Sequence, residues 1–136
     1  VMLSHVVYAE RDSLPAGFST VWVKDELRRQ LGFDGAVFCD DLSMKATESF
    51  GSMPRRARLA LDAGCDMVLV CNDRAAALET VSALADYTNP LSLVRLARLH
   101  GTGSLLRETL LASEEWRQAA ERIQHLADRP PLELGA

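Results

Sequence analysis

The sequence predicts an α/β fold with a parallel sheet, because short apolar segments alternate with segments of helical periodicity. The apolar segments are residues 1–7, 36–39 and 67–71, and the last two show no alternation of polar and apolar side chains. Continuously apolar runs are typical of parallel strands that are buried on both faces. A helical segment follows each run, and strands that alternate with helices form consecutive βα units with right-handed crossovers.

The first βα unit is expected to continue through a loop into a helix. Residues 9–17 contain Pro and Gly and predict the loop. Ser19 can cap a helix that runs to Leu31, in which apolar residues recur every four positions. Gly32 suits the left-handed position that ends a helix, and Asp34-Gly35 is a turn pair that leads into the second strand.

The second unit is expected to carry a loop over residues 40–53 and then a helix. Pro54 lies where proline is favoured, in the first turn, and the helix runs to Ala63. Gly64 is expected at the C′ position.

The third unit is expected to end in a helix over residues 74–86, with Asn72 or Asp73 as its cap. Beyond it the pattern is purely helical. Asn89-Pro90 opens a helix that ends near His100-Gly101.

A last helix is expected to begin after Ser113 and to stop before Pro130-Pro131. Its apolar residues share one face, which predicts a core stripe: Trp116, Ala119, Ala120, Ile123 and Leu126.

Three parallel strands leave two edges unpaired, which is unfavourable for an isolated domain. A (β/α)8 (TIM) barrel needs roughly 250 residues, and the chain has 136. It also begins on Val1, within a predicted strand. We therefore expect residues 1–88 to be the last three βα units of such a barrel, residues 89–128 to be helices packing on it, and residues 129–136 to be a tail.

Composition narrows the function classes. A net charge of −4 with mixed signs argues against binding to nucleic acid or to an anionic membrane surface, and no apolar run reaches transmembrane length. The cysteines, Cys39, Cys65 and Cys71, lie in or beside apolar segments and are expected to be reduced and packed as small hydrophobic residues, as in the cytoplasm. The three histidines are too scattered to predict a metal site.

Asp40 and Asp41 are the leading candidates for chemistry, because they follow a buried strand at its carboxyl end, where α/β folds place their active sites. The alternative is that either residue caps the next turn. Two neighbours in sequence also point in different directions, so they do not easily form one acid/base pair. Asp66 begins a strand and is expected to form a turn or an ion pair.

Other polar residues have simpler interpretations. Asn72 is expected to cap a helix, and His5 to be a buried core histidine, although its place near a strand end makes it a candidate for substrate contact. The group Arg55, Arg56 and Arg58 predicts a solvated helix face. Ser43 has no His and acid spaced for a recognisable triad.

Four blocks, residues 1–8, 14–19, 31–44 and 63–72, resemble in order and spacing the C-terminal part of bacterial β-N-acetylhexosaminidases of glycoside hydrolase family 3, of the peptidoglycan-recycling type. In that family the block Gly-Phe-x-Gly is followed by Ser-Asp, and the resemblance implies that Asp40 is the nucleophile. Cys39 replaces the usual Ser, a small-for-small change. The segment 41–44 is similar to the branch that acts on N-acetylglucosaminides.

The resemblance implies a retaining hydrolase that removes terminal β-linked N-acetylglucosamine from muropeptides in the cytoplasm, with no cofactor and no metal. It also implies an acid/base, a His paired with Asp on a mobile loop, and sugar-binding residues, all in an N-terminal half that is missing here. The 136-residue chain alone is therefore expected to be nearly inactive, since acid catalysis is worth about 10²–10⁴-fold.

Two alternatives remain at the level of sequence. The chain is either an inactive truncated paralogue that serves as a binding or assembly module, or a family 3 glycosidase or phosphorylase that acts on another β-glycoside.

Overall fold

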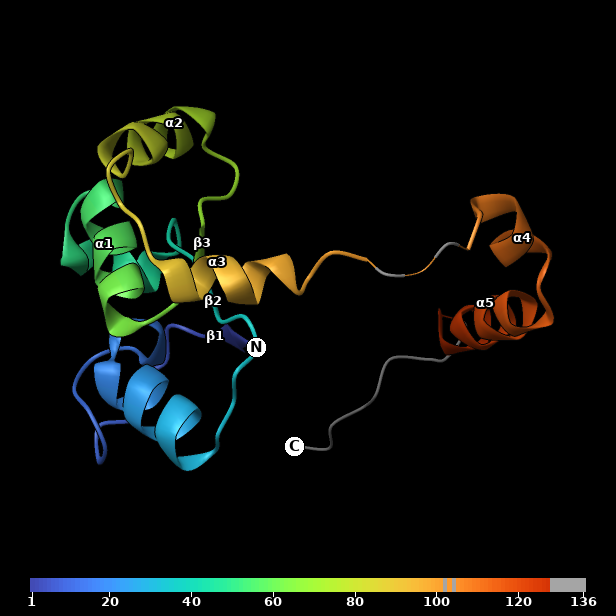
Figure 1. The fold of residues 1–136 in the computed structure, drawn as a ribbon, viewed down its shortest axis with the longest axis horizontal. Coiled ribbons are helices and arrows are strands. Elements are labelled where there is room, and N and C mark those ends of the chain that lie inside the picture. Colours follow the sequence, from blue (N-terminus) through green and yellow to red (C-terminus); the bar gives the residue numbers. More distant parts are fainter. Residues whose placement is uncertain (102, 104, 128–136) are drawn as a thin grey trace, which may run out of the picture. The chain divides into compact units, whose positions relative to one another are not determined.

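The computed structural model describes residues 1–101, 103 and 105–127, which form two compact units, Val1–His100 and a second one that begins at Gly101. The first unit contains a sheet of three strands: β1 (Met2–Leu3), β2 (Phe38–Asp41) and β3 (Met67–Leu69). Their order is β1-β2-β3, and both neighbouring pairs are parallel (Figure 1). The predicted α/β fold with a parallel sheet is confirmed.

The strands differ in length from the prediction. β1 pairs over two residues, not seven, because the chain turns away after Leu3, and Val7 instead forms an isolated antiparallel bridge with Pro15. β2 begins two residues later than predicted and includes both aspartates. β3 ends at Leu69, two residues before the predicted end. The Cys71 amide beyond it donates to the side chain of Asp41 in β2 and not to a backbone carbonyl, so the ladder does not continue.

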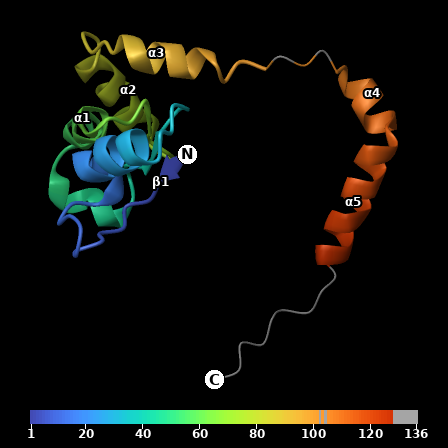
Figure 2. The ribbon, with the colours of Figure 1, turned by 60° about the horizontal axis from the view of Figure 1, so that its bottom comes forward.

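Helices follow each strand. The 3₁₀ segment η1 (Ala16–Phe18) and the helix η2 (Val21–Gln30) come after β1, and the helices η3 (Lys45–Phe50) and α1 (Met53–Ala63) come after β2. The helix α2 (Arg74–Ala83) comes after β3. The views in Figures 1 and 2 show η2, α1 and α2 along one side of the strands.

The core lies between the strands and these helices. Its fully or nearly fully buried members come from every layer: Phe18, Val23, Val37, Cys39, Leu42, Ala57, Ala60, Ala63 and Cys65. Leu31, predicted to continue the η2 stripe, is 76% exposed because the helix has already ended before it.

The predicted end of α1 and the predicted start of α2 are confirmed, whereas α2 ends at Ala83 and not at residue 86. Pro54 lies in the first turn of α1, and Gly64 after it has φ of 115°, which only glycine adopts without strain. A Cβ at Gly64 would also come within 3.1 Å of Val23. Of the two cap candidates for α2, Asp73 accepts the bond from the Ala76 amide at 2.9 Å, whereas Asn72 has φ of 60°.

The loop predicted over residues 40–53 contains the 3₁₀ helix η3, and hydrogen bonds from two side chains to its carbonyls hold it in place. The Thr47 hydroxyl is buried and donates to the Leu42 carbonyl at 2.7 Å. Arg56, predicted on a solvated face, instead reaches back from α1 and donates to the carbonyls of Leu42 (2.9 Å) and Gly51 (2.7 Å). The prediction was wrong for Arg56 because helical periodicity does not show that a loop folds over the helix.

The helix α3 (Pro90–Ala97) belongs to the first unit, with Asn89 as its cap, as predicted. Ser92 and Arg95 attach it to the buried carboxylate of Asp66. The first compact unit therefore includes α3 and extends to His100, while the predicted division of the chain at residue 88 stays a prediction.

The second unit contains α4 (Arg107–Ala112) and α5 (Glu114–Ala127), which contact each other. Ser113 caps α5 as predicted, accepting from the Trp116 amide at 3.1 Å. The predicted core stripe is not buried within this unit, since Trp116 is 44% and Ile123 66% exposed. Packing of these helices on a barrel stays a prediction, and Pro130-Pro131 and residues 129–136 lie outside the described residues.

Within the described part of the chain, no helix combines the length and the apolar character needed to cross a membrane.

Candidate active site

Asp40 and Asp41 are the last residues of the central strand, at the carboxyl end predicted for a site. The pairing of β2 with β3 is irregular here. Phe38 pairs with Met67 and Asp41 with Leu69, so β2 takes three steps where β3 takes two. Regular alternation would place Asp40 opposite Leu69. The register therefore shifts between Phe38 and Asp41, which is a bulge over Cys39 and Asp40, and bulges re-aim side chains beside active sites.

The Asp41 carboxylate accepts three hydrogen bonds, two from backbone amides and one from a side-chain hydroxyl. Its Oδ1 accepts from the amides of Ser43 and Cys71, both at 3.0 Å, and its Oδ2 accepts from the Ser43 hydroxyl at 2.5 Å. Burial alone would raise the pKa of the Asp41 carboxyl, but these hydrogen bonds outweigh burial and hold this pKa below its ordinary value. The Asp41 carboxylate thus stays ionised, and its oxygens are engaged in hydrogen bonds.

Asp40 has a different environment. It is half-buried, and its Oδ1 accepts from the amide of Asp41 at 2.8 Å. Among the described residues, no other hydrogen bond to this carboxylate and no ion pair is present. One oxygen is anchored and the other is available, which is the arrangement that a nucleophile requires. Of the two adjacent carboxylates, the geometry favours Asp40 for chemistry and Asp41 for structure.

His5 is buried, with 8% exposure, as expected for a core histidine. Its ring packs 5.5 Å from that of Phe18, and its Nε2 lies 2.9 Å from the backbone carbonyl of Asp41. A carbonyl only accepts, so Nε2 is the donor. The buried Nδ1 has no partner within the described residues. A contact between His5 and substrate stays a prediction.

Asp66 lies at the opposite end of the strands and forms the ion pairs predicted for it. Its side chain is fully buried, accepts from Arg28 (2.6 Å) and Ser92 (2.7 Å), and pairs with Arg95 at 3.2 Å. The amide of Val37 donates to it as well, at 2.9 Å. Burial would raise the pKa of Asp66, but these donors and cations lower it below its ordinary value.

The cysteines are free thiols, as predicted. Cys39, beside Asp40, and Cys65 are fully buried. The contact with Cys65, together with burial, raises the pKa of Cys39, so this thiol stays protonated. Cys39 therefore serves as packing behind the site, as expected for a residue in the place of Ser.

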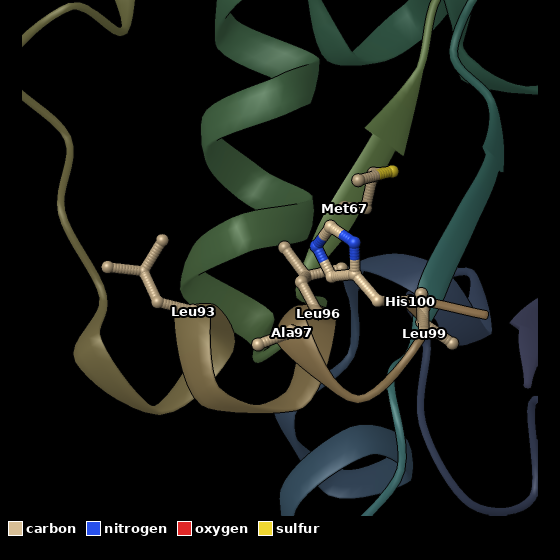
Figure 3. Close-up of a pocket in the computed structure, with 6 residues that line it drawn as sticks. All are labelled: Met67, Leu93, Leu96, Ala97, Leu99 and His100. Atoms are coloured by element: carbon tan, nitrogen blue, oxygen red, sulfur yellow. The ribbon is translucent and has the colours of Figure 1, made fainter. Parts of the chain in front are cut away.

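In the described part of the chain, the apolar pockets are not lined by Asp40 or Asp41. An apolar pocket of about 450 Å³ lies between the start of β3 and the end of α3, where Figure 3 shows Met67 facing Leu96 and His100. Met67 begins its strand, whereas Asp40 ends its own, so this pocket is not the site. Among the described residues, no group of three or more His, Cys, Asp or Glu side chains is placed to hold a metal ion.

Sequence reasoning missed three contributors to the site: the Cys71 amide, Thr47 and Arg56. Cys71 contributes through its backbone, to which residue type gives no clue. Thr47 and Arg56 brace the segment after Asp41. In the sequence, a threonine in a polar loop and an arginine nine residues later look the same whether they are hydrogen-bonded to the loop or exposed to solvent.

A half-buried carboxylate with an available oxygen, at the carboxyl end of a parallel strand, lies where α/β enzymes place their active-site groups. Residues 1–100 match the family described as "Glycosyl hydrolase family 3 N terminal domain". The chain belongs to glycosyl hydrolase family 3, and the predicted family is confirmed.

Two beta-hexosaminidases illustrate the likeness. That of Thioalkalivibrio sulfidiphilus is 50% identical over 134 residues, covering 98% of this chain and 39% of that protein. That of Hydrogenovibrio crunogenus is 50% identical over 125 residues, covering 92% of this chain and 35% of that protein. The chain thus spans less than two fifths of the length of these relatives.

Solved structures agree. NagZ from Neisseria gonorrhoeae in complex with a zinc ion superimposes with a TM-score of 0.72 at 34% identity, covering 94% of this chain and 37% of that one. The same protein in complex with N-trifluoroacetyl-D-glucosamine gives a TM-score of 0.68 at 35% identity, covering 91% of this chain and 35% of that one.

Proposed function

We propose that this chain supplies the nucleophile of a retaining β-N-acetylglucosaminidase, and that the nucleophile is Asp40. The observation that carries the proposal is the pair of environments at the end of β2: Asp41 is saturated with hydrogen bonds, and Asp40 keeps one oxygen available. Membership in glycosyl hydrolase family 3 and the beta-hexosaminidase relatives support this choice of reaction.

The reaction proceeds in two steps at one carbon. An Asp40 carboxylate oxygen attacks the anomeric carbon, forming a C–O bond while the bond to the leaving-group oxygen breaks. The leaving group takes a proton from a general acid. Water, deprotonated by the same group, then attacks the anomeric carbon and releases Asp40, so the configuration is retained.

The general acid must be another group than Asp41. An acid has to be protonated at the working pH, and the pKa of Asp41 lies below its ordinary value. We propose that the acid/base is a His–Asp pair on a loop. This pair and most of the sugar-binding residues would lie in sequence outside these 136 residues. The relatives are more than twice as long as this chain, which leaves room for such a segment.

We also propose that the three βα units are part of a (β/α)8 barrel. Met2, Phe38 and Met67 are in register and so share one face of the sheet, while Leu3 and Cys39 in the next row turn to the core under the helices. Met2 is 55% and Met67 37% exposed. An apolar row on the face away from η2, α1 and α2 is what a barrel interior requires.

The substrate we propose is a muropeptide with terminal β-linked N-acetylglucosamine, cleaved in the cytoplasm during recycling of peptidoglycan. One NagZ structure similar to this chain binds N-trifluoroacetyl-D-glucosamine, an analogue of that sugar. The shared fold at 35% identity supports the same sugar here.

A panel of aryl β-glycosides tests the specificity, using the native gene product purified from its own cells, each sugar with and without phosphate. We expect the N-acetylglucosaminide to be cleaved at least about 10-fold faster than the glucoside, because a site built for the N-acetyl group loses contacts when it is absent. Phosphate should leave the rate unchanged. Preference for the glucoside, or phosphate-dependent release of a sugar 1-phosphate, would contradict the proposal.

A further inference from the structure

We propose that Asp41 is a positioning residue, which ties together the ends of all three strands and thereby fixes the direction of Asp40. This inference rests on the proposed function of Asp40 as nucleophile. It assigns to Asp41 no contact with substrate.

The first tie joins β2 to β3. After Leu69 the ordinary ladder stops, and the amide of Cys71 donates to Asp41 Oδ1 at 3.0 Å. The Leu42 amide donates to the Leu69 carbonyl at 2.9 Å, so the two strands are held on both sides of the Asp41 side chain. The carboxylate takes the place of the missing backbone acceptor at the point where the bulge has shifted the register.

The second tie joins β2 to β1. The two strands pair directly only from Met2 to Leu3, at the start of the sheet. Beyond that, the buried ring of His5 donates to the Asp41 carbonyl at 2.9 Å. The same residue is thus bonded to one neighbouring strand through its side chain and to the other through its backbone.

The consequence for Asp40 follows from its position. It precedes Asp41 in the bulge and is anchored by the Asp41 amide at 2.8 Å. A bulge has no ladder bond of its own to keep it in place. With Asp41 fixed on one side and Cys39 fully buried on the other, the available oxygen of Asp40 has a set direction. A nucleophile misplaced by 1 Å loses about 10²-fold in rate.

Two substitutions separate position from charge. In Asp41→Asn the amide oxygen still accepts from the Cys71 and Ser43 amides, and the NH₂ group can donate to the Ser43 hydroxyl, so the ties survive without the charge. In Asp41→Ala all three side-chain bonds are lost. Asp62→Asn, on the exposed face of α1, is the matched control for removing one carboxylate.

We expect Asp41→Ala to lower kcat of the native gene product by about 10²-fold with KM changed less than about threefold, and Asp41→Asn to recover most of the loss. Hydrogen exchange should speed up at the Cys71 amide in the Ala variant only, while the Asp66 amide, bonded to Val37 at the other end of the strands, keeps its rate.

The inference is overturned if Asp41→Ala keeps kcat, or if Asn is as damaging as Ala, since the charge and not the ties would then matter. Equal acceleration at both amides would also overturn it, because the role would be general stability. Asp40→Asn is assayed beside these variants. If that variant keeps turnover, it is the proposed nucleophile that fails.

Discussion

Asp40→Asn is expected to lower kcat of the native gene product by on the order of 10⁴-fold or more, because removing a nucleophile abolishes the covalent route. The amide oxygen of Asn can still accept the bond from the Asp41 amide, so the bulge should survive. KM should change little, since Asp40 acts in the transition state. Initial rates with an aryl N-acetyl-β-glucosaminide measure both constants.

The control for this variant is Asp62→Asn, which makes the same chemical change on the exposed face of α1. It should keep wild-type rates, and both variants should unfold at the wild-type temperature. Turnover by Asp40→Asn at more than a few per cent of the wild-type rate would show that another group forms the bond.

Asp66→Ala is expected to reduce the free energy of unfolding by about 3–5 kcal/mol, as found when one partner of a buried ion pair is removed. The fully buried carboxylate holds Arg28 and Arg95, and Ser92 brings α3 to it. Its loss removes the buried carboxylate that the two cations and the Val37 amide share, and leaves Arg28 with only backbone carbonyls and Arg95 with only the exposed Asp34. Urea unfolding monitored by circular dichroism measures the change.

The same carboxylate predicts a pH dependence. The folded-state pKa of Asp66 lies below its ordinary value of 3.8, so the group stabilises the fold fully above that value. This stability is lost as the pH falls below 3.8 and through the folded pKa. The wild-type protein should therefore weaken in acid over this range, and Asp66→Asn should show a flatter profile.

Asp62→Ala is the matched control for Asp66→Ala. The Asp62 carboxylate accepts no hydrogen bond within the described residues, so removing it should change the free energy of unfolding by less than about 0.5 kcal/mol. A cost below about 1 kcal/mol for Asp66→Ala would mean that α3 and the strands are held together by other contacts.

Local features of the fold were predictable because they depend on neighbouring residues. Pro54 and Gly64 marked the ends of α1, and Asn89 marked the start of α3, since caps and left-handed turns are set within a few positions. The position of Asp40 at a strand end was predictable for the same reason, from a short apolar run followed by polar residues.

Features that depend on contacts across the chain were not predictable. The bulge over Cys39 and Asp40 arises from the register with β3, about thirty residues away, and the apolar run could show only that a strand was present. The ion pair of Asp66 was predicted in kind, but its partners Arg28 and Arg95 are 38 and 29 residues away in sequence. The Asp41 carboxylate was ambiguous because a cap and a tie between strands require the same residue type.

The exposed stripe of α5 shows a different limit. Its spacing predicts an apolar face correctly, yet Trp116 and Ile123 are exposed within their unit. Periodicity identifies a face that favours burial, but it does not identify the surface that covers it.

The most direct test of Asp40 as nucleophile is mass spectrometry of the native gene product after incubation with 5-fluoro-N-acetyl-β-glucosaminyl fluoride. Attack forms a bond from Asp40 to the anomeric carbon and releases fluoride, which needs little acid assistance, and the second fluorine slows hydrolysis of the product. We expect one added sugar on the peptide that contains Asp40, and none in Asp40→Asn. A sugar on another residue would contradict the assignment of Asp40 as nucleophile. So would a protein that hydrolyses the glycosyl fluoride without ever carrying the sugar.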